Sequence, residues 1–315
     1  MKICILDWTT VTSGDISADI FKEFGDVSCY ELTDNEKAAE QIGDSDMVLC
    51  NKVQITRQVM DKCPRLRYIG LFATGYNNID IEAASEKSIT VCNAGSYSTG
   101  AVAQQTFAYI LSHYSKISEY DMFVKDGGWI KSKTFSKFPI KTMELQGKTL
   151  AVIGYGSIGK AVAEIGSAFG MNVIINTRTL PSECRFRTVS REEAFSEADV
   201  LTVHCPLTAE TAGMVNADTL SLMKKNAVFI NTARGAIVDE YALAEALNSG
   251  KIAAAYLDVL KEEPMSSETP LRKAKNCVIT PHTAWAPLET RLRLIEIVCS
   301  NIKAFLNGNP RNKVN

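Results

Sequence analysis

The chain has 315 residues, a length that accommodates two domains of ordinary size. Hydrophobic residues make up 46% and charged residues 22%, as in globular proteins, and the net charge of -2 gives no electrostatic basis for binding nucleic acid or an anionic membrane. No apolar run is long enough to cross a bilayer, and the nine cysteines include no C-x-x-C pair, so the sequence supports neither a zinc site nor a dithiol site and favours a cytoplasmic protein.

Strand-like and helix-like segments alternate over the first 95 residues. Short apolar runs predict strands, and the segments between them have helical periodicity. This order predicts a parallel sheet covered by helices. The predicted strands are 3–6, 27–32, 47–50, 68–72 and 89–92, and the predicted helices are 16–24, 34–42, 56–63 and 81–86.

A turn follows the fourth predicted strand, where open α/β sheets hold ligands. It reads Ala73-Thr-Gly-Tyr-Asn-Asn78. The backbone N–H groups of Thr74 and Gly75 are able to hold a carboxylate there. The same segment is compatible with an ordinary turn, and by itself does not decide between the two.

A long helical pattern then runs from Thr99 to about Val124, after capping residues, with a predicted hinge near Tyr97. The next segment, 125–141, contains five Lys and one Asp, which is typical of a solvated loop. Three aromatic residues inside it suggest that it also covers apolar surface, such as that of another subunit: Trp129, Phe135 and Phe138.

The stretch 149–178, TLAVIGYGSIGKAVAEIGSAFGMNVIINTR, reads as strand, glycine turn, helix and strand. Gly154, Gly156 and Gly159 have the spacing G-x-G-x-x-G. The first permits a tight turn, the second lets a pyrophosphate approach the backbone, and the third lets the helix pack closely on the strand. In this βαβ context the motif predicts a dinucleotide site.

The residues at the end of the second strand of this unit bear on the choice between NAD and NADP. An NAD site usually has an acidic residue there to hold the adenine ribose hydroxyls. This chain has Asn176-Thr177-Arg178 and no carboxylate. A guanidinium suits a 2′-phosphate, so Thr177 and Arg178 predict that NADP is favoured over NAD, although a solvated loop arginine is the alternative.

Further strands and helices complete a doubly wound nucleotide domain. The predicted strands are 200–203, 223–230, 252–257 and 278–279, the predicted helices are 217–222 and 241–247, and a last helix, 287–306, is expected to return to the first domain. The expected fold is α/β, with two Rossmann-like domains that have parallel sheets. A dinucleotide-binding domain, 99–283, is inserted into a substrate domain made of 1–98 and 284–315.

Three ionisable residues lie at predicted strand ends on the edge of the glycine turn: Arg234, Glu263 and His282. A histidine supplies an acid near neutrality, a nearby carboxylate favours its charged form, and an arginine holds a substrate carboxylate. Each alone is compatible with a surface pair or a satisfied histidine. Of the other two histidines, His113 reads as structural, and His204, beside Cys205 and Pro206, as part of the cofactor wall.

The motifs GYGSIG, VHCPLT, NTARGAIVDE, LDVLKEEP and TPHTAWAP, in order along the whole chain, resemble the D-2-hydroxyacid dehydrogenase family. YSTGAVAQ and TPHTAW resemble the branch of glycerate dehydrogenase and hydroxypyruvate (glyoxylate) reductase. The resemblance implies reduction of a small 2-oxo acid, hydroxypyruvate or glyoxylate, to the D-2-hydroxy acid. It also implies a homodimer, because the family's segment matching 125–141 reaches the second subunit.

The resemblance also assigns roles to residues. It implies that Arg234 binds the 2-oxo acid, that His282 is the acid/base and that Glu263 pairs with it. The position of the family's ribose carboxylate corresponds to Thr177, where this chain departs from the pattern. Further implied contacts are Ser157 and Ile158 with the pyrophosphate, Thr232, Ala233, Arg234 and Asp258 with the nicotinamide end, and the turn of Thr74 and Gly75 with the substrate carboxylate. Separately from the resemblance, Trp285 and Trp129 are candidates for the wall of the substrate pocket.

The sequence leaves other functions open. Oxidation of D-3-phosphoglycerate or another D-2-hydroxy acid is one, although the chain leaves little room after its last helix for a regulatory domain. A formate-type enzyme does not need a Glu–His pair, because its reaction involves no proton exchange. A dinucleotide-sensing scaffold like the family's co-repressors keeps the same three residues, but the chain lacks basic patches and disordered tails.

Overall fold

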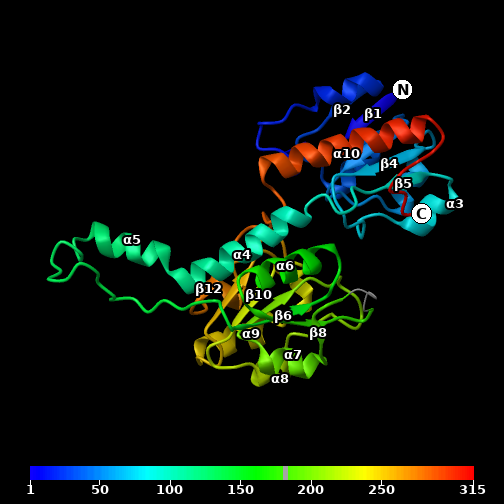
Figure 1. Cartoon of the computed structure of the whole chain (residues 1–315). Helices are drawn as coiled ribbons and strands as arrows, with labels where there is room; N and C mark the ends of the chain where they lie inside the picture. Colours follow the sequence, from blue (N-terminus) through cyan, green and yellow to red (C-terminus); the bar gives the residue numbers. More distant parts are fainter. Residues whose placement is uncertain (180–183) are drawn as a thin grey trace. The chain divides into compact units, whose positions relative to one another are not determined.

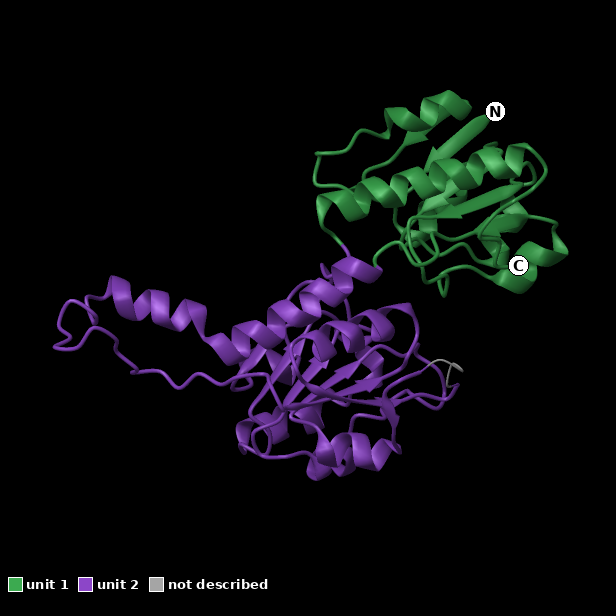
Figure 2. Ribbon diagram, viewed as in Figure 1, with its two compact units in different colours: residues 1–98, 286–315 green, residues 99–285 purple. Residues whose placement is uncertain are grey.

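A computed structural model describes residues 1–179 and 184–315 (Figure 1). The chain divides into two compact units, one of residues 1–98 with 286–315 and the other of residues 99–285 (Figure 2). The second boundary lies two residues beyond the expected one. Each unit has its own sheet, and all strand pairs within the two sheets are parallel. The predicted α/β class with two parallel sheets is therefore confirmed.

The sheet of unit 1 has the order β2-β1-β3-β4-β5. The central strands β3 and β4 are buried at every position, because helices cover both faces of a parallel sheet. The strands are β1 (Lys2–Ile5), β2 (Asp26–Cys29), β3 (Met47–Cys50), β4 (Tyr68–Leu71) and β5 (Thr90–Cys92). The helices are α1 (Ala38–Ile42), α2 (Arg57–Lys62), α3 (Ile81–Glu86) and α10 (Leu288–Leu306).

The last helix, α10, belongs to unit 1, as expected for a chain that returns to its first domain. The ring of Phe305 on α10 lies 4.8 Å from that of Tyr68 on β4. Two predicted helices of unit 1 differ from the expectation. The segment 16–24 forms a 3₁₀ helix over Ala18–Phe24, and the segment 34–42 divides into a 3₁₀ turn, Asn35–Lys37, and the short helix α1.

The sheet of unit 2 has the order β12-β11-β10-β9-β6-β7-β8. Its strands are β6 (Thr149–Ile153), β7 (Asn172–Asn176), β8 (Arg187–Thr188), β9 (Val200–Val203), β10 (Val228–Asn231), β11 (Ala254–Leu257) and β12 (Cys277–Ile279). Its covering helices are α4 (Thr99–Ser115), α6 (Ser157–Ala168), α7 (Arg191–Glu197), α8 (Ala217–Leu222) and α9 (Glu240–Asn248). The short edge strand β8 was not predicted. The predicted strand 223–230 begins only at Val228, because Lys224, Lys225 and Asn226 are exposed.

The single long helix predicted from Thr99 to Val124 is wrong. The helix α4 ends at Ser115, and Lys116 has a left-handed backbone conformation with φ 54°, which interrupts an α-helix. A second helix, α5 (Ile117–Lys125), follows. Together with the loop that follows it, α5 extends away from the rest of unit 2 (Figure 2). We call residues 117–141 the arm.

Candidate functional site

The glycine turn joins β6 to α6. Gly154 has φ 91°, and a Cβ atom added to it would lie 2.6 Å from the backbone nitrogen of Cys205. A Cβ atom on Gly159 would lie 2.0 Å from the carbonyl oxygen of Gly154, whereas one on Gly156 would meet no atom within 4 Å. The outer two glycines thus permit close packing of the turn, and Gly156 leaves its backbone open to a ligand. This arrangement fits the pyrophosphate of a dinucleotide.

A cavity of about 560 Å³ lies beside this turn. The carboxyl ends of β6, β7 and β9 and the segments after them form its walls. It brings together the predicted residues Gly154, Gly156, Thr177, Arg178, Cys205 and Pro206. It also contains side chains that were not assigned to the cofactor from the sequence: Tyr155, Arg191, Thr208, Glu210, Thr211 and Met214.

Other predicted cofactor contacts lie outside the lining of this cavity. Ser157 begins α6, and Ile158 packs against the core of unit 2. Gly159 lies against the backbone of Gly154 and the side chain of Val152. The residues predicted for the nicotinamide end follow β10 and β11. Contacts of these residues with a cofactor therefore stay predictions.

His204 lines the cavity, as expected for a wall residue. Its Nε2 atom lies 2.9 Å from the hydroxyl oxygen of Thr202. Burial lowers the pKa of His204 to about 3, so its imidazole is neutral at pH 7. The side chain thus gives the cavity a polar but uncharged wall.

The three predicted catalytic residues follow three strands that are neighbours in the sheet. Arg234 follows β10, Glu263 follows β11 and His282 follows β12. Nδ1 of His282 lies 2.6 Å from Oε2 of Glu263, and Oε1 of Glu263 accepts a hydrogen bond of 3.0 Å from the backbone N–H of Leu260. The structure thus forms the predicted Glu–His pair and holds its carboxylate at both oxygens.

Asp258 organises the turn that carries His282. Its buried carboxylate accepts hydrogen bonds from the backbone N–H groups of Thr283, at 2.9 Å, and Ala284, at 2.8 Å, and from the hydroxyl of Thr280. The backbone N–H of His282 donates to the carbonyl of Asp258 at 2.8 Å. His282 has φ 54°, a conformation that a non-glycine residue keeps only where its surroundings impose it. Both carboxylate oxygens of Asp258 thus accept hydrogen bonds from this turn.

Arg234 extends from a turn that a buried asparagine holds. Asn231, at the end of β10, donates from Nδ2 to the carbonyl of Arg234 at 2.9 Å and accepts from the N–H of Ala233 at 2.9 Å. The Arg234 side chain is exposed. The hydroxyl oxygen of Thr232 is buried and has no hydrogen-bond partner in the described part of the chain. Sequence reasoning missed Asn231, although a polar residue that ends an apolar strand is a visible signal.

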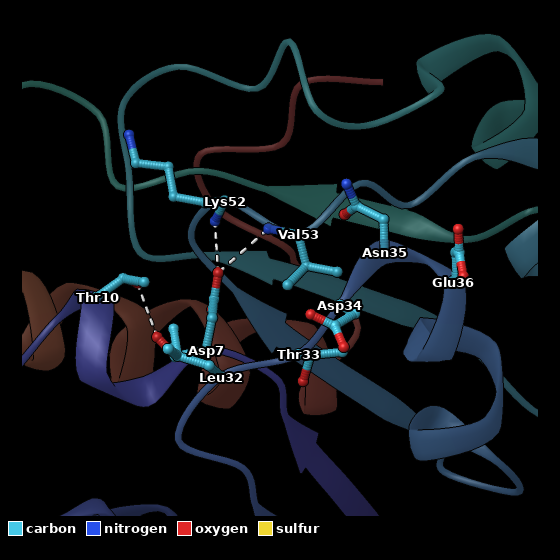
Figure 3. Close-up of a pocket in the computed structure, with 9 residues that line it drawn as sticks. All are labelled: Asp7, Thr10, Leu32, Thr33, Asp34, Asn35, Glu36, Lys52 and Val53. Carbon is cyan, nitrogen blue, oxygen red and sulfur yellow. Dashed lines mark hydrogen bonds between the residues drawn. The ribbon is translucent and has the colours of Figure 1, made fainter. Parts of the chain in front are cut away.

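In unit 1, a cavity of about 610 Å³ lies at the carboxyl ends of β1 and β3, where the strand order reverses (Figure 3). The carboxylate of Asp7, which follows β1, accepts hydrogen bonds from the backbone N–H groups of Asn51, Lys52 and Val53 at 2.8, 2.6 and 3.2 Å. Asn78 donates to the carbonyl of Val53 at 2.8 Å. Hydrogen bonds to Asp7 and from Asn78 therefore hold the turn after β3 in place.

The predicted carboxylate-binding turn follows β4. The carbonyl of Thr74 accepts a hydrogen bond of 2.7 Å from Asn93, and its hydroxyl donates to the carbonyl of Gly95. Within residues 1–179 and 184–315, the backbone N–H groups of Thr74 and Gly75 donate to no protein acceptor. Trp285, another predicted substrate residue, is half-buried at the end of unit 2.

The described residues lack two further features. No group of three or more His, Cys, Asp or Glu side chains is placed there to hold a metal ion. No described helix is both long enough and apolar enough to span a membrane.

Comparison with known proteins agrees with this site. Residues 107–284 match the model of the family described as D-isomer specific 2-hydroxyacid dehydrogenase, NAD binding domain. The chain is 40% identical to a hydroxypyruvate reductase of Blautia hydrogenotrophica over 100% of both chains. It is 42% identical to a glyoxylate reductase of Aeropyrum pernix, over 83% of this chain and 80% of that one.

A solved structure of an acyclic imino acid reductase in complex with NADPH and D-Arg is also similar. It has a TM-score of 0.87 and 30% sequence identity over 100% of both chains. The family match covers the glycine turn, the cavity beside it and the Arg–Glu–His residues. The chain therefore belongs to the D-isomer specific 2-hydroxyacid dehydrogenase family and is an oxidoreductase that acts on the CH–OH group with a nicotinamide dinucleotide.

Proposed function

We propose that this protein reduces hydroxypyruvate or glyoxylate to the D-2-hydroxy acid, with NADPH favoured over NADH. The observation that carries the proposal is the 2.6 Å contact between Nδ1 of His282 and the carboxylate of Glu263, on the edge that also holds Arg234. The two relatives described above, one named hydroxypyruvate reductase and the other glyoxylate reductase, support the substrate class.

His282 is the acid in this proposal. An ionised carboxylate only accepts hydrogen bonds, so Nδ1 of His282 carries the hydrogen and Glu263 accepts it. Nε2, on the other side of the ring, is then the atom that gives a proton to the substrate oxygen. A bound nicotinamide supplies the hydride for C2. Hydride and proton together convert the carbonyl into the CH–OH group, and His282 regains its proton from solvent.

Arg234 is the proposed clamp for the acidic substrate. Its guanidinium can hold a carboxylate bidentately and polarise the neighbouring carbonyl. The Nη1 atom donates to the carbonyl of Ala233 at 2.7 Å, which leaves further N–H groups of the same fork available for a substrate. From unit 1, the backbone N–H groups of Thr74 and Gly75 are the proposed donors to the substrate carboxylate.

The proposed cofactor preference rests on the cavity beside the glycine turn. Thr177 and Arg178 line it at the end of β7, where an NAD site usually has an acidic residue. No carboxylate stands at this position to repel a 2′-phosphate. The similar imino acid reductase structure contains NADPH, which is compatible with this proposal.

The proposed function is tested by following cofactor oxidation with a panel of 2-oxo acids, each with NADPH and with NADH. We expect turnover of hydroxypyruvate and glyoxylate and a higher kcat/KM with NADPH. Chiral analysis of the product should give the D-isomer. Binding of NADPH without turnover of any 2-oxo acid would instead favour a dinucleotide-sensing scaffold.

We also propose a homodimer in which the arm binds a second copy of the chain. Seven large apolar residues of the arm are exposed to solvent, by 42% to 93% of their surface: Ile117, Met122, Val124, Trp129, Ile130, Phe135 and Phe138. The indole N–H of Trp129 donates to the carbonyl of Phe135 at 3.1 Å, which shapes the loop without burying these side chains. Large apolar side chains exposed together on one segment favour a protein interface there.

A cytoplasmic location is the remaining proposal. All nine cysteines are free thiols in the structure, and five of them are buried as small apolar side chains. Free cysteines used in this way fit a reducing compartment. Fractionation of cells that express the full-length protein tests this.

A further inference from the structure

Two arginines from successive elements line the same part of unit 2. Arg178 follows β7, and Arg191 is the first residue of α7. Both line the cavity beside the glycine turn, together with Thr177 and Thr179. Only the first of the two arginines was predicted from the sequence as a cofactor residue.

The two arginines follow the two strands at one edge of the sheet. The strand β8 pairs in parallel with β7, with Ile174 opposite Arg187 and Ile175 opposite Thr188. Arg178 lies two residues beyond the end of β7, and Arg191 lies three residues beyond the end of β8. The pairing extends one step further, because the N–H of Val189 donates to the carbonyl of Ile175 at 2.9 Å.

A side-chain hydrogen bond holds the two strand exits together. Nδ2 of Asn176 donates to the carbonyl of Val189 at 3.0 Å. The hydroxyl of Thr177 donates to the carbonyl of Thr179 at 3.2 Å, which closes the turn that carries Arg178. Both arginines are therefore presented from backbone segments that are held in place.

The charges around the cavity favour an anion. Within residues 1–179 and 184–315, neither Arg178 nor Arg191 forms an ion pair. By contrast, Arg187 on the neighbouring strand β8 pairs with Glu197. The described lining of the cavity contains one carboxylate, that of Glu210. The described lining thus contains two guanidinium groups and one carboxylate.

We propose that Arg191 is a second ligand of the 2′-phosphate of NADPH and, with Arg178, forms a two-arginine clamp that sets cofactor specificity. The inference deepens the proposed NADPH preference and rests on it. A phosphate monoester has three acceptor oxygens and close to two negative charges at pH 7, enough to engage two guanidinium forks. In this proposal Arg191 affects only the binding of NADPH and takes no part in hydride or proton transfer.

Ligands that differ only in the 2′-phosphate test the clamp. Dissociation constants are measured for NADPH and NADH, and for 2′,5′-ADP and 5′-AMP, with the wild type, Arg178→Gln, Arg191→Gln, Arg191→Lys and the double glutamine variant. The loss of a charge-assisted contact should weaken NADPH and 2′,5′-ADP binding roughly tenfold to a hundredfold in Arg191→Gln. Binding of NADH and 5′-AMP should change less than about twofold. Arg191→Lys, which keeps the charge but loses the fork, should be intermediate.

Arg187→Gln is the matched control, because Arg187 is an arginine of the same sheet edge that pairs with Glu197 and is absent from the cavity lining. It should leave all four dissociation constants unchanged. Thermal unfolding of each variant establishes that the protein is folded.

The proposal is overturned if Arg191→Gln leaves NADPH binding unchanged, or if it weakens NADPH and NADH equally, as an arginine that stacks on adenine would. A wild type that binds 2′,5′-ADP no more tightly than 5′-AMP overturns both the clamp and the NADPH preference. If the variants change NADPH binding as expected but the protein turns over no 2-oxo acid, the two-arginine clamp stands and the proposed reaction is wrong.

Discussion

The backbone at Gly235 lies against the backbone of Leu260: a Cβ atom added to Gly235 would be 1.8 Å from the carbonyl carbon and 2.0 Å from the carbonyl oxygen of Leu260. Gly235 follows Arg234, and the N–H of Leu260 donates to Glu263 at 3.0 Å. The close approach therefore couples the segment that carries the arginine to the segment that carries the carboxylate. Any side chain at position 235 would have to push these two segments apart.

Gly235→Ala should impair both activity and stability. Overpacking at such a contact costs about 1–3 kcal/mol in the free energy of unfolding. Displacement of Arg234 or Glu263 by even about 1 Å is expected to lower kcat/KM by roughly a hundredfold. Urea unfolding and steady-state kinetics measure the two effects.

Gly100→Ala is the control for this prediction. Gly100 lies in the first turn of α4, where an added Cβ atom meets nothing within 4 Å. Alanine there should be neutral or stabilise the helix by about 0.5–1 kcal/mol. Equal losses in the two glycine variants would contradict the proposed coupling.

Glu263→Gln should lower kcat while the protein stays folded. The substitution keeps the size of the side chain but removes the charge that holds Nδ1–H of His282. General acid catalysis contributes on the order of 10²–10⁴ in rate, so we expect a loss of about a hundredfold and a larger one in His282→Gln. Glu262→Gln, an exposed neighbour, should have wild-type kcat. Wild-type turnover in His282→Gln would remove the proposed mechanism.

Asp258→Ala should disorganise the turn of His282. The substitution leaves the backbone N–H groups of Thr283 and Ala284 without their acceptor, at a cost of about 1–3 kcal/mol for the buried donor of Ala284. Because His282 has a positive φ that this carboxylate supports, kcat should fall together with stability. Differential scanning calorimetry and single-turnover rates check both, and an unchanged rate would show that the turn holds its conformation without Asp258.

Charged substitutions on the arm should dissociate the proposed homodimer. The side chains of Ile130 and Phe135 are 88% and 93% exposed, so aspartate at either position should not disturb the fold of the monomer. Sedimentation velocity of Ile130→Asp with Phe135→Asp should show a mass close to that of one chain, 34.5 kDa. Tyr241→Asp places the same charge on another exposed part of unit 2 and should stay dimeric. A wild type that sediments as a monomer would rule out this interface.

His113 should make the protein less stable in acid. Burial lowers the pKa of His113 from the ordinary 6.5 to about 4, and its Nδ1 has no partner in the described part of the chain. Between pH 6.5 and 4 the unfolded chain binds a proton that the native protein does not, so stability falls as the pH falls, by about 1.4 kcal/mol per pH unit. His113→Gln should remove this dependence.

Urea unfolding at pH 6.5 and pH 5 measures the effect of His113. The variant should lose roughly 2 kcal/mol less than the wild type over this interval. Its stability above about pH 8 serves as the reference, because a histidine with an ordinary pKa of about 6.5 is neutral there in the unfolded chain as well as in the native one. The same loss in both proteins would mean that His113 is not the group responsible.

The order of apolar runs and turns was sufficient to predict two parallel sheets, because a buried strand needs a continuous apolar segment and a crossover helix needs a helical period. The break at Lys116 was not visible in this way. The apolar period continues across it from α4 into α5, and only the left-handed conformation of one residue interrupts the helix. The two-residue strand β8 contains no apolar run and owes its existence to pairing with β7.

The sequence by itself determined which groups are chemically able to act: three glycines at the start of a helix, Thr177 and Arg178 in place of the usual acid, and the Arg234, Glu263 and His282 set. Their types and spacing carry this information, because each type has its own charge and hydrogen-bonding groups. Only the tertiary structure decided which of them meet. Three features depend on the order and register of separate strands, which no local pattern encodes: the contact of Glu263 with His282, the place of Arg178 and Arg191 in one cavity lining, and the hydrogen bonds of Asp258 to the turn of His282.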